Sequence, residues 1–204
     1  MITEFKTLSK GGEGLFKDRG SKFLGFAIHI NSEEDVKGAL AELRKQYYDA
    51  RHHCYAYVLG AERKTFRAND DGEPNHSAGD PILGQINSKE LTDTLVVVIR
   101  YFGGTKLGVS GLINAYKLAA EEALDNATVI SVDVQNEIII QYGYDDTNEV
   151  MRLVNDMNIS IVDQKFEASC ELKGAIKVNL REQLESKVQL LNDLGHKIDL
   201  EIED

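Results

Sequence analysis

The sequence predicts an α+β protein of two domains. The chain has 204 residues, which suits one large or two small domains. Charge is distributed unevenly, because residues 1–131 have a net charge of −2 and residues 132–204 have −9, out of −11 for the whole chain. Such a change suggests two domains with different surfaces, 1–131 and 132–204, with the boundary within residues 129–133.

Composition excludes several classes of protein. With 42% hydrophobic and 28% charged residues, the chain matches an ordinary globular protein. Its apolar runs, such as Leu95–Ile99, are too short to span a membrane, and the N-terminus lacks the apolar stretch of a secretory signal. We therefore expect a cytoplasmic protein with no membrane partner. Cys54 and Cys170 are 116 residues apart without a CxxC spacing, which favours two reduced, buried thiols.

Strand and helix signals alternate along the first domain. A helix is predicted from Ser32 to Tyr48, because the capping residue Ser32 is followed by Asp35 and then by an apolar stripe at helical spacing. Residues 95–99 form an unbroken apolar run that is typical of a strand buried on both faces. Further strands are predicted at residues 5–8, 14–17, 21–30, 53–59 and 63–67.

Two more helices complete the first domain. Ser77 resembles an N-cap, with Pro81 in the first turn of a helix that runs to about Lys89. A long helix is predicted from about Leu112 to Asn126.

The second domain shows a simpler order of elements. Strand, helix, strand, strand, helix and strand follow one another, which is the βαββαβ order of the ferredoxin-like fold. These elements are predicted at residues 134–142, 147–157, 160–168, 171–178, 182–194 and 197–202.

The strongest local signal is RYFGGTKLGVSG at residues 100–111, where a buried strand leads through a glycine-rich loop into a helix. Glycines let backbone N–H groups approach an anion, and a helix N-terminus adds the positive end of its dipole. The spacing is neither that of a Walker A loop nor GxGxxG. The segment is therefore either a phosphate cradle or a tight strand-to-helix turn.

A second candidate is the loop NDDGEPNHSAGDP at residues 69–81. Its carboxylates are hard oxygen ligands of the kind that Mg²⁺ and Ca²⁺ prefer, but the spacing is not that of an EF-hand. Asp and Gly also favour such a turn for local reasons. A metal site and a plain turn remain alternatives here, and we assign no metal ligand. Ser77 and Gly79, at the start of the next helix, are a further place for an anion.

The third candidate is the segment Arg51-His52-His53-Cys54. On a strand His52 and Cys54 share one face, so the pair is either a thiolate with its base, two metal ligands, or part of a half-buried strand. Aromatic and basic residues are interleaved in this part of the chain, which is compatible with base stacking in a nucleic-acid groove or with core packing.

Three ordered motifs carry a family resemblance. ARHHCYAYVLG, DDGEP followed by AGDPIL, and VVVIRYFGGTKLGVSGLINAY together closely resemble the signature of the IMPACT/YigZ family. The chain departs from the usual pattern at Asn75-His76-Ser77, where a Gly-Thr pair is common, and at Ser110, where Gly or Pro is usual.

The resemblance implies a fold and a cellular process without giving a reaction. It implies an N-terminal domain like domain 2 of ribosomal protein S5 and a ferredoxin-like C-terminal domain similar to the last domain of elongation factor G. It also implies a role in translation. The family's shared surface corresponds here to His52, Asp70, Asp71, Gly72, Glu73, Pro74, Ala78, Gly79, Arg100, Tyr101, Gly103, Gly104, Leu107, Gly108 and Gly111.

We therefore expect a regulator of translation, rather than an enzyme, that binds RNA, the ribosome or a translation-associated protein, with no cofactor and no readout of DNA sequence. The alternatives are an enzyme that acts on a phosphorylated small molecule with carboxylate-bound Mg²⁺, and a docking module whose acidic C-terminal domain faces a basic partner. The residues expected to bind the ligand are His52, Asp70, Asp71, Glu73, Ser77, Gly79, Arg100, Tyr101, Gly103, Gly104, Lys106, Gly108 and Gly111.

Overall fold

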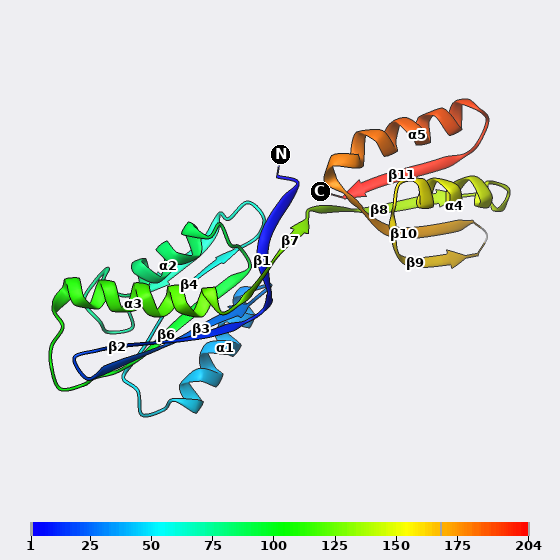
Figure 1. The fold of residues 1–204 in the computed structure, drawn as a ribbon. Helices are drawn as coiled ribbons and strands as arrows, with labels where there is room; N and C mark the ends of the chain where they lie inside the picture. The colour runs from blue at the N-terminus through cyan, green and yellow to red at the C-terminus, as the bar shows by residue number, and fades with distance from the viewer. Residues whose placement is uncertain (1, 168, 204) are drawn as a thin grey trace. The chain divides into compact units, whose positions relative to one another are not determined.

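The computed structural model describes residues 2–167 and 169–203 and divides the chain into two compact units (Figure 1). The N-terminal unit is Ile2–Val132, and the C-terminal unit begins at Asp133. Both contain helices and antiparallel sheets, which confirms the predicted α+β class. In the part of the chain that the structure describes, no helix combines the length and apolar character needed to cross a membrane.

A five-stranded antiparallel sheet forms the centre of the N-terminal unit, in the order β2-β3-β6-β4-β5. The middle strand β6 has no exposed surface from Leu95 to Ile99, as its unbroken apolar run predicts. The strands are β2 (Gly12–Asp18), β3 (Ser21–His29), β4 (His52–Leu59), β5 (Thr65–Asn69) and β6 (Thr94–Tyr101).

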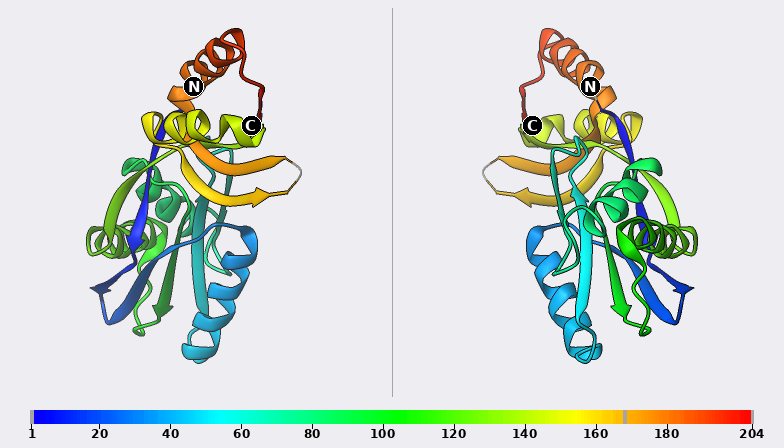
Figure 2. Two further views of the ribbon diagram at one scale, coloured as in Figure 1. Left: turned by 90° about the vertical axis from the view of Figure 1, so that its right-hand side faces the viewer. Right: turned by 90° about the vertical axis from the view of Figure 1, so that its left-hand side faces the viewer.

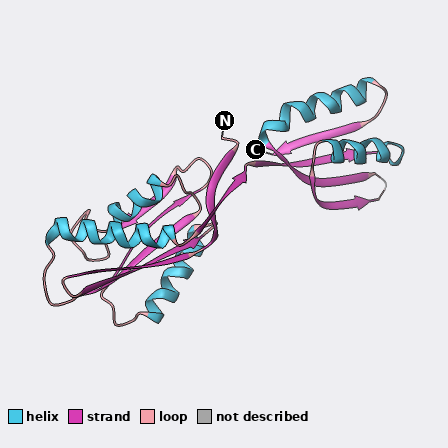
Figure 3. Ribbon diagram, in the orientation of Figure 1, coloured by secondary structure: helices cyan, strands magenta, loops and turns pink. Residues whose placement is uncertain are grey.

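Helices cover both faces of this sheet (Figures 2 and 3). Helix α1 (Glu33–Gln46) packs on one face, and α2 (Gly79–Ser88) and α3 (Gly108–Asp125) pack on the other, so that two separate hydrophobic cores form. The predicted cap of α1 is confirmed, because Ser32 Oγ accepts a hydrogen bond from the Asp35 N–H group at 3.2 Å.

Two elements of this unit differ from the prediction. Strands β1 (Glu4–Lys10) and β7 (Thr128–Asp133) form a two-stranded sheet of their own, although residues 129–133 were expected to be only a boundary. Helix α3 begins at Gly108, within the glycine-rich segment, and not at Leu112. Strand β1, which pairs with β7, lies near the start of the unit's sequence, so no local sequence pattern indicates that residues 128–133 form a strand.

The C-terminal unit has the predicted βαββαβ order, and its four strands form an antiparallel sheet in the order β11-β8-β10-β9. Both helices and alternate strand residues contribute to a single core. The predicted strand 160–168 ends at Phe166, and residue 168 lies outside the described residues. The elements are β8 (Gln135–Tyr142), α4 (Thr147–Asp156), β9 (Ser160–Phe166), β10 (Cys170–Lys177), α5 (Arg181–Asp193) and β11 (Ile198–Glu203), with short 3₁₀ turns at Tyr144–Asp146 and Val178–Leu180.

Candidate functional site

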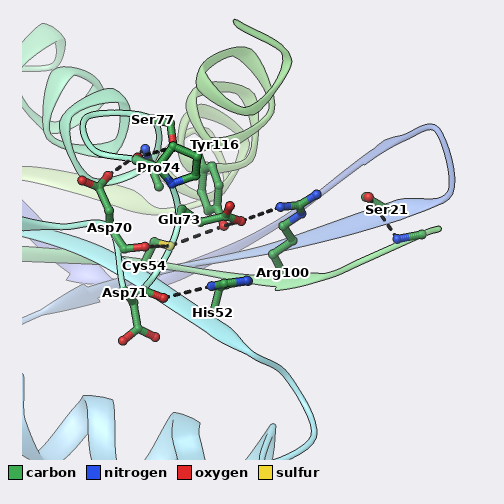
Figure 4. Close-up of polar contacts among 12 residues, drawn as sticks. Ser21, His52, Cys54, Asp70, Asp71, Glu73, Pro74, Ser77, Arg100 and Tyr116 are labelled. Carbon is green, nitrogen blue, oxygen red and sulfur yellow. Dashed lines mark hydrogen bonds and ion pairs between the residues drawn. The ribbon is translucent and has the colours of Figure 1, made fainter. Parts of the chain in front are cut away.

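A buried ion pair joins the acidic loop to the end of β6 (Figure 4). Glu73 Oε1 accepts hydrogen bonds from Arg100 Nη1 at 2.6 Å and from the Tyr116 hydroxyl at 2.8 Å. Glu73 is only 9% exposed and Arg100 only 7%. The guanidinium also lies 5.5 Å from the centre of the Phe23 ring and 5.6 Å from that of Phe102. These contacts hold Arg100 in one position.

Cys54 extends this network into the core. Its Sγ atom lies 3.0 Å from the Asp70 carbonyl oxygen and 3.4 Å from the Tyr116 hydroxyl oxygen. Burial raises the pKa of the Cys54 thiol and that of the Tyr116 hydroxyl, so both groups stay protonated at neutral pH. Among the described residues, no hydrogen bond joins Cys54 to His52. The structure therefore shows no activated thiolate at this position. It also corrects the expected half-buried strand, because both faces of β4 are buried from His53 to Leu59.

Asp70 has a structural role in the acidic loop. Its Oδ1 atom accepts hydrogen bonds from the N–H groups of Ala78 at 2.9 Å and Gly79 at 2.8 Å, and its Oδ2 atom accepts one from His76 at 2.9 Å. Burial would raise the pKa of Asp70, but the N–H groups of Gly79, His76 and Ala78 outweigh burial and lower it.

The start of α2 is therefore closed to an external anion, contrary to the prediction for Ser77 and Gly79. The Gly79 amide already donates to Asp70. Helix α2 begins at Gly79 after Ala78, so the prediction of Ser77 as the N-cap is also wrong. The buried Ser77 hydroxyl instead donates to the Pro74 carbonyl oxygen at 2.6 Å.

Asp71 is engaged with strand β4 and helix α1. Its carbonyl oxygen accepts a hydrogen bond from His52 Nδ1 at 2.9 Å, and its Oδ2 atom accepts one from the His53 N–H group at 2.7 Å. Arg44 Nη2 lies 3.5 Å from Oδ1. The three carboxylates of the loop thus have different partners, and the described residues contain no group of three or more His, Cys, Asp or Glu that could hold a metal ion.

The glycine-rich segment contains a close-packed turn at Gly103 and an uncapped helix start at Gly108. Gly103 donates its N–H to Ser21 Oγ at 3.1 Å, and a Cβ atom on Gly103 would lie 1.9 Å from the Gly20 carbonyl carbon. Gly103 is therefore a close-packing position and does not offer a free amide. Gly108, at a φ of +75°, begins α3 without a side-chain cap and without an acidic residue in the first turn. The positive end of α3 remains open.

Two adjoining pockets of about 400 Å³ each lie around this segment. They share Arg100 and the ring of Phe102, which is 58% exposed. The lining of the first, which we call the His52 pocket, includes Asp49, Arg51, His52 and Tyr101 besides the shared pair. The lining of the second, the Lys106 pocket, includes Glu73, Pro74, Lys106 and Gly108.

The structure gathers some of the predicted binding residues and separates others. His52, Arg100 and Tyr101 line the first pocket, and Glu73, Lys106 and Gly108 line the second. The Tyr101 hydroxyl donates to Asp49 Oδ1 at 2.7 Å, and this bond, together with burial, raises the pKa of Tyr101 to about 12. Neither pocket is lined by Asp70, Asp71, Ser77, Gly79, Gly103, Gly104 or Gly111.

Several lining residues were missing from the predicted binding set, among them a cation and an exposed aromatic residue. Phe102 and Arg51 line the His52 pocket, and Phe102 also lines the Lys106 pocket. The signal available in the sequence was their position next to Arg100 and His52, at ends of strands that turn out to be neighbours in the sheet.

The chain is similar in sequence to proteins of one known family. The sequence model of the family described as "Impact N-terminal domain" matches residues 19–124. The chain is 37% identical to IMPACT family member YvyE of Bacillus subtilis over 130 residues, which cover 64% of this chain and 60% of YvyE. It is 31% identical to IMPACT family member YigZ of Escherichia coli over 158 residues, covering 76% of this chain and 78% of YigZ.

A solved structure extends the likeness to the whole fold. The crystal structure of a protein described as hypothetical is similar over 97% of both chains, with a TM-score of 0.74 and 25% sequence identity. The matching family model, the relatives and the three ordered motifs agree. This chain belongs to the IMPACT family.

Proposed function

We propose that the protein is a cytoplasmic regulator of translation that binds single-stranded RNA, free or within the ribosome, through the His52 and Lys106 pockets. The family resemblance supports the proposed role in translation. The observation that supports RNA as the ligand is the wall shared by the two pockets. There the fixed cation Arg100 lies against the exposed ring of Phe102.

The chemistry around this wall fits a nucleic-acid strand. Arg51 lines the first pocket and Lys106 the second, so each of the two pockets that Phe102 lines has an exposed cation. Proteins that bind single strands combine such charges with aromatic rings on which bases stack, and stacking contributes roughly 1–3 kcal/mol per base. The nearby carboxylates are engaged, because Asp49 accepts from Tyr101 and Glu73 pairs with Arg100.

The test is the salt dependence of RNA binding. Fluorescence anisotropy with an unstructured 12-nucleotide RNA should show affinity that falls steeply with salt, because bound phosphates release counterions. Lys106→Ala and Arg51→Ala should each weaken binding and flatten the slope of log K against log salt by about 0.7 per lost phosphate contact. Phe102→Ala should weaken binding while leaving the slope unchanged.

Lys64→Ala is the matched control, because Lys64 is an exposed cation beyond the opposite end of β4 and pairs with Glu62. Its affinity for the RNA should equal that of the unmodified protein. Absence of RNA binding at low salt would contradict the proposal. In that case co-sedimentation with ribosomes would identify a ribosomal or other translation-associated protein as the partner instead.

A further inference from the structure

His52 offers a hydrogen-bond acceptor to its pocket. Its Nδ1 atom lies 2.9 Å from the Asp71 carbonyl oxygen, and a carbonyl oxygen can only accept, so Nδ1 carries the hydrogen. In the neutral ring the lone pair is then on Nε2. Among the described residues Nε2 has no partner, and Figure 4 shows the ring turned so that this side faces away from Asp71. A ligand in the pocket meets an acceptor whose tautomer is fixed.

Two arginines line the same pocket as this acceptor. Arg51 is exposed at the pocket and has no hydrogen bond or ion pair with any residue that the structure describes. Arg100 is 7% exposed, gives Nη1 to Glu73, and leaves its buried Nε without a partner. The other polar pair of the pocket, Tyr101 and Asp49, is already joined. The pocket thus combines cationic donors for an anion with an open acceptor at His52 Nε2, beside the Asp49 carboxylate whose Oδ1 atom is held by Tyr101.

We infer that the His52 pocket recognises the ribose 2′-hydroxyl of RNA, with His52 Nε2 accepting its hydrogen while Arg51 and Arg100 attract the adjoining phosphate. A phosphate diester has no hydrogen to donate, so it satisfies the arginines and not His52. The 2′-hydroxyl is the donor that a ribose carries beside its phosphate and that deoxyribose lacks. This inference rests on the proposed RNA binding and adds selectivity for RNA over DNA.

The acidic loop provides the geometry for this role. Asp71 has a φ of 40°, in the left-handed region, and this conformation directs its carbonyl oxygen to His52. Gly72 follows at a φ of +86°, and a Cβ atom on Gly72 would lie 3.6 Å from His52 Nδ1. Glycine adopts a positive φ readily, whereas Asp71 is a non-glycine residue that its surroundings must hold in this conformation. The Asp-Gly turn therefore orients a pocket side chain.

The test compares three 12-nucleotide strands of one uracil-containing sequence: RNA, its deoxyuridine DNA counterpart, and 2′-fluoro RNA. The 2′-fluoro strand keeps an RNA-like sugar but has no hydrogen to donate. Anisotropy titrations of the full chain should give RNA about fivefold tighter binding than either of the other strands, as expected for one hydrogen bond.

Two substitutions of His52 distinguish the loss of its Nε2 acceptor from the loss of its structural hydrogen bond to Asp71. His52→Asn keeps an N–H group near Nδ1 to donate to Asp71 and removes the distant acceptor, so RNA affinity should fall to that for DNA while DNA affinity stays unchanged. His52→Gln places an amide oxygen near Nε2 and should keep part of the preference. His76→Ala is the control, because His76 lies in the acidic loop and pairs with Asp80; this variant should retain the preference for RNA.

The outcomes distinguish the two proposals. Binding of all three strands with equal affinity, or a preference that survives in His52→Asn, overturns the role of His52 and leaves RNA binding intact. No binding of any strand at low salt overturns the proposed function itself.

Discussion

At the scale of single residues, Arg100 links stability to function. It lines both pockets, yet it is buried and is the ion-pair partner of the equally buried Glu73. Removing one partner of a buried pair leaves an uncompensated charge, whereas replacing both partners is often nearly neutral. A loss of RNA binding in an Arg100 variant therefore reports on the fold as well as on the pockets, and Arg51 and Lys106 are better probes of binding.

Arg100→Met should lower the free energy of unfolding by about 3–5 kcal/mol, because Glu73 would keep a buried charge with no cation beside it. The double variant Arg100→Met with Glu73→Gln should recover most of that loss. Urea unfolding of both proteins measures the difference. Equal stability of the single variant and the unmodified protein would show that the pair is not energetically coupled.

Asp70→Asn should cost about 1.5–3 kcal/mol at neutral pH, because the charged carboxylate accepts from three N–H groups. The pKa of Asp70 is lowered from 3.8, so its contribution is fully present above about pH 5 and is lost as the pH falls through the lowered pKa. The melting temperatures of the two proteins should converge in acid. Asp80→Asn, at an exposed carboxylate in the first turn of α2, is the control and should change stability little at either pH.

At the scale of elements, the sequence predicted what short-range patterns determine. The cap and apolar stripe of α1 and the buried run of β6 lie within one stretch of chain each, and both predictions are confirmed. The start of α2 was misassigned because its cap comes from Asp70, eight and nine residues before the amides that it holds. Strand β7 was missed because its partner β1 is more than a hundred residues away.

Two glycines provide a contrast between turn and helix. Gly103→Ala should destabilise the protein by about 1–3 kcal/mol, because the new Cβ atom would lie 1.9 Å from backbone of the β2–β3 turn. Gly38→Ala should instead stabilise α1 by about 0.5–1 kcal/mol, because that Cβ atom meets nothing within 4 Å. Chemical denaturation of the two variants measures both effects. A tolerated Gly103→Ala would show that the turn can move away.

At the scale of the whole molecule, the site combines segments that the sequence keeps apart. The pockets take residues from around positions 49–52, 73–74, 100–102 and 106–112. The motifs identified most of these segments, but spacing alone did not show which glycine offers an amide and which one permits close packing. The pairing of β4 with β6 brings positions 49–52 close to 100–102, and the ion pair between Glu73 and Arg100 joins the acidic loop to them.

The uneven charge predicts an effect of the C-terminal unit on RNA affinity. Each unit has cores built from its own residues, and residues 132–204 carry a net charge of −9. A chain that ends after Asp133 retains β7 and should bind RNA more tightly than the full chain at low salt, with the difference vanishing at high salt. Filter binding across a salt series measures this. Weaker binding by the shortened chain would indicate that the acidic unit contributes contacts.

Because Arg100 and Phe102 line both pockets, the length of a nucleotide ligand decides whether it reaches one pocket or both. On the proposed RNA binding, a mononucleotide would occupy one pocket, whereas two linked nucleotides could occupy both and contact Arg100 and Phe102 from each. We expect dinucleotides to compete for the protein far better than mononucleotides do.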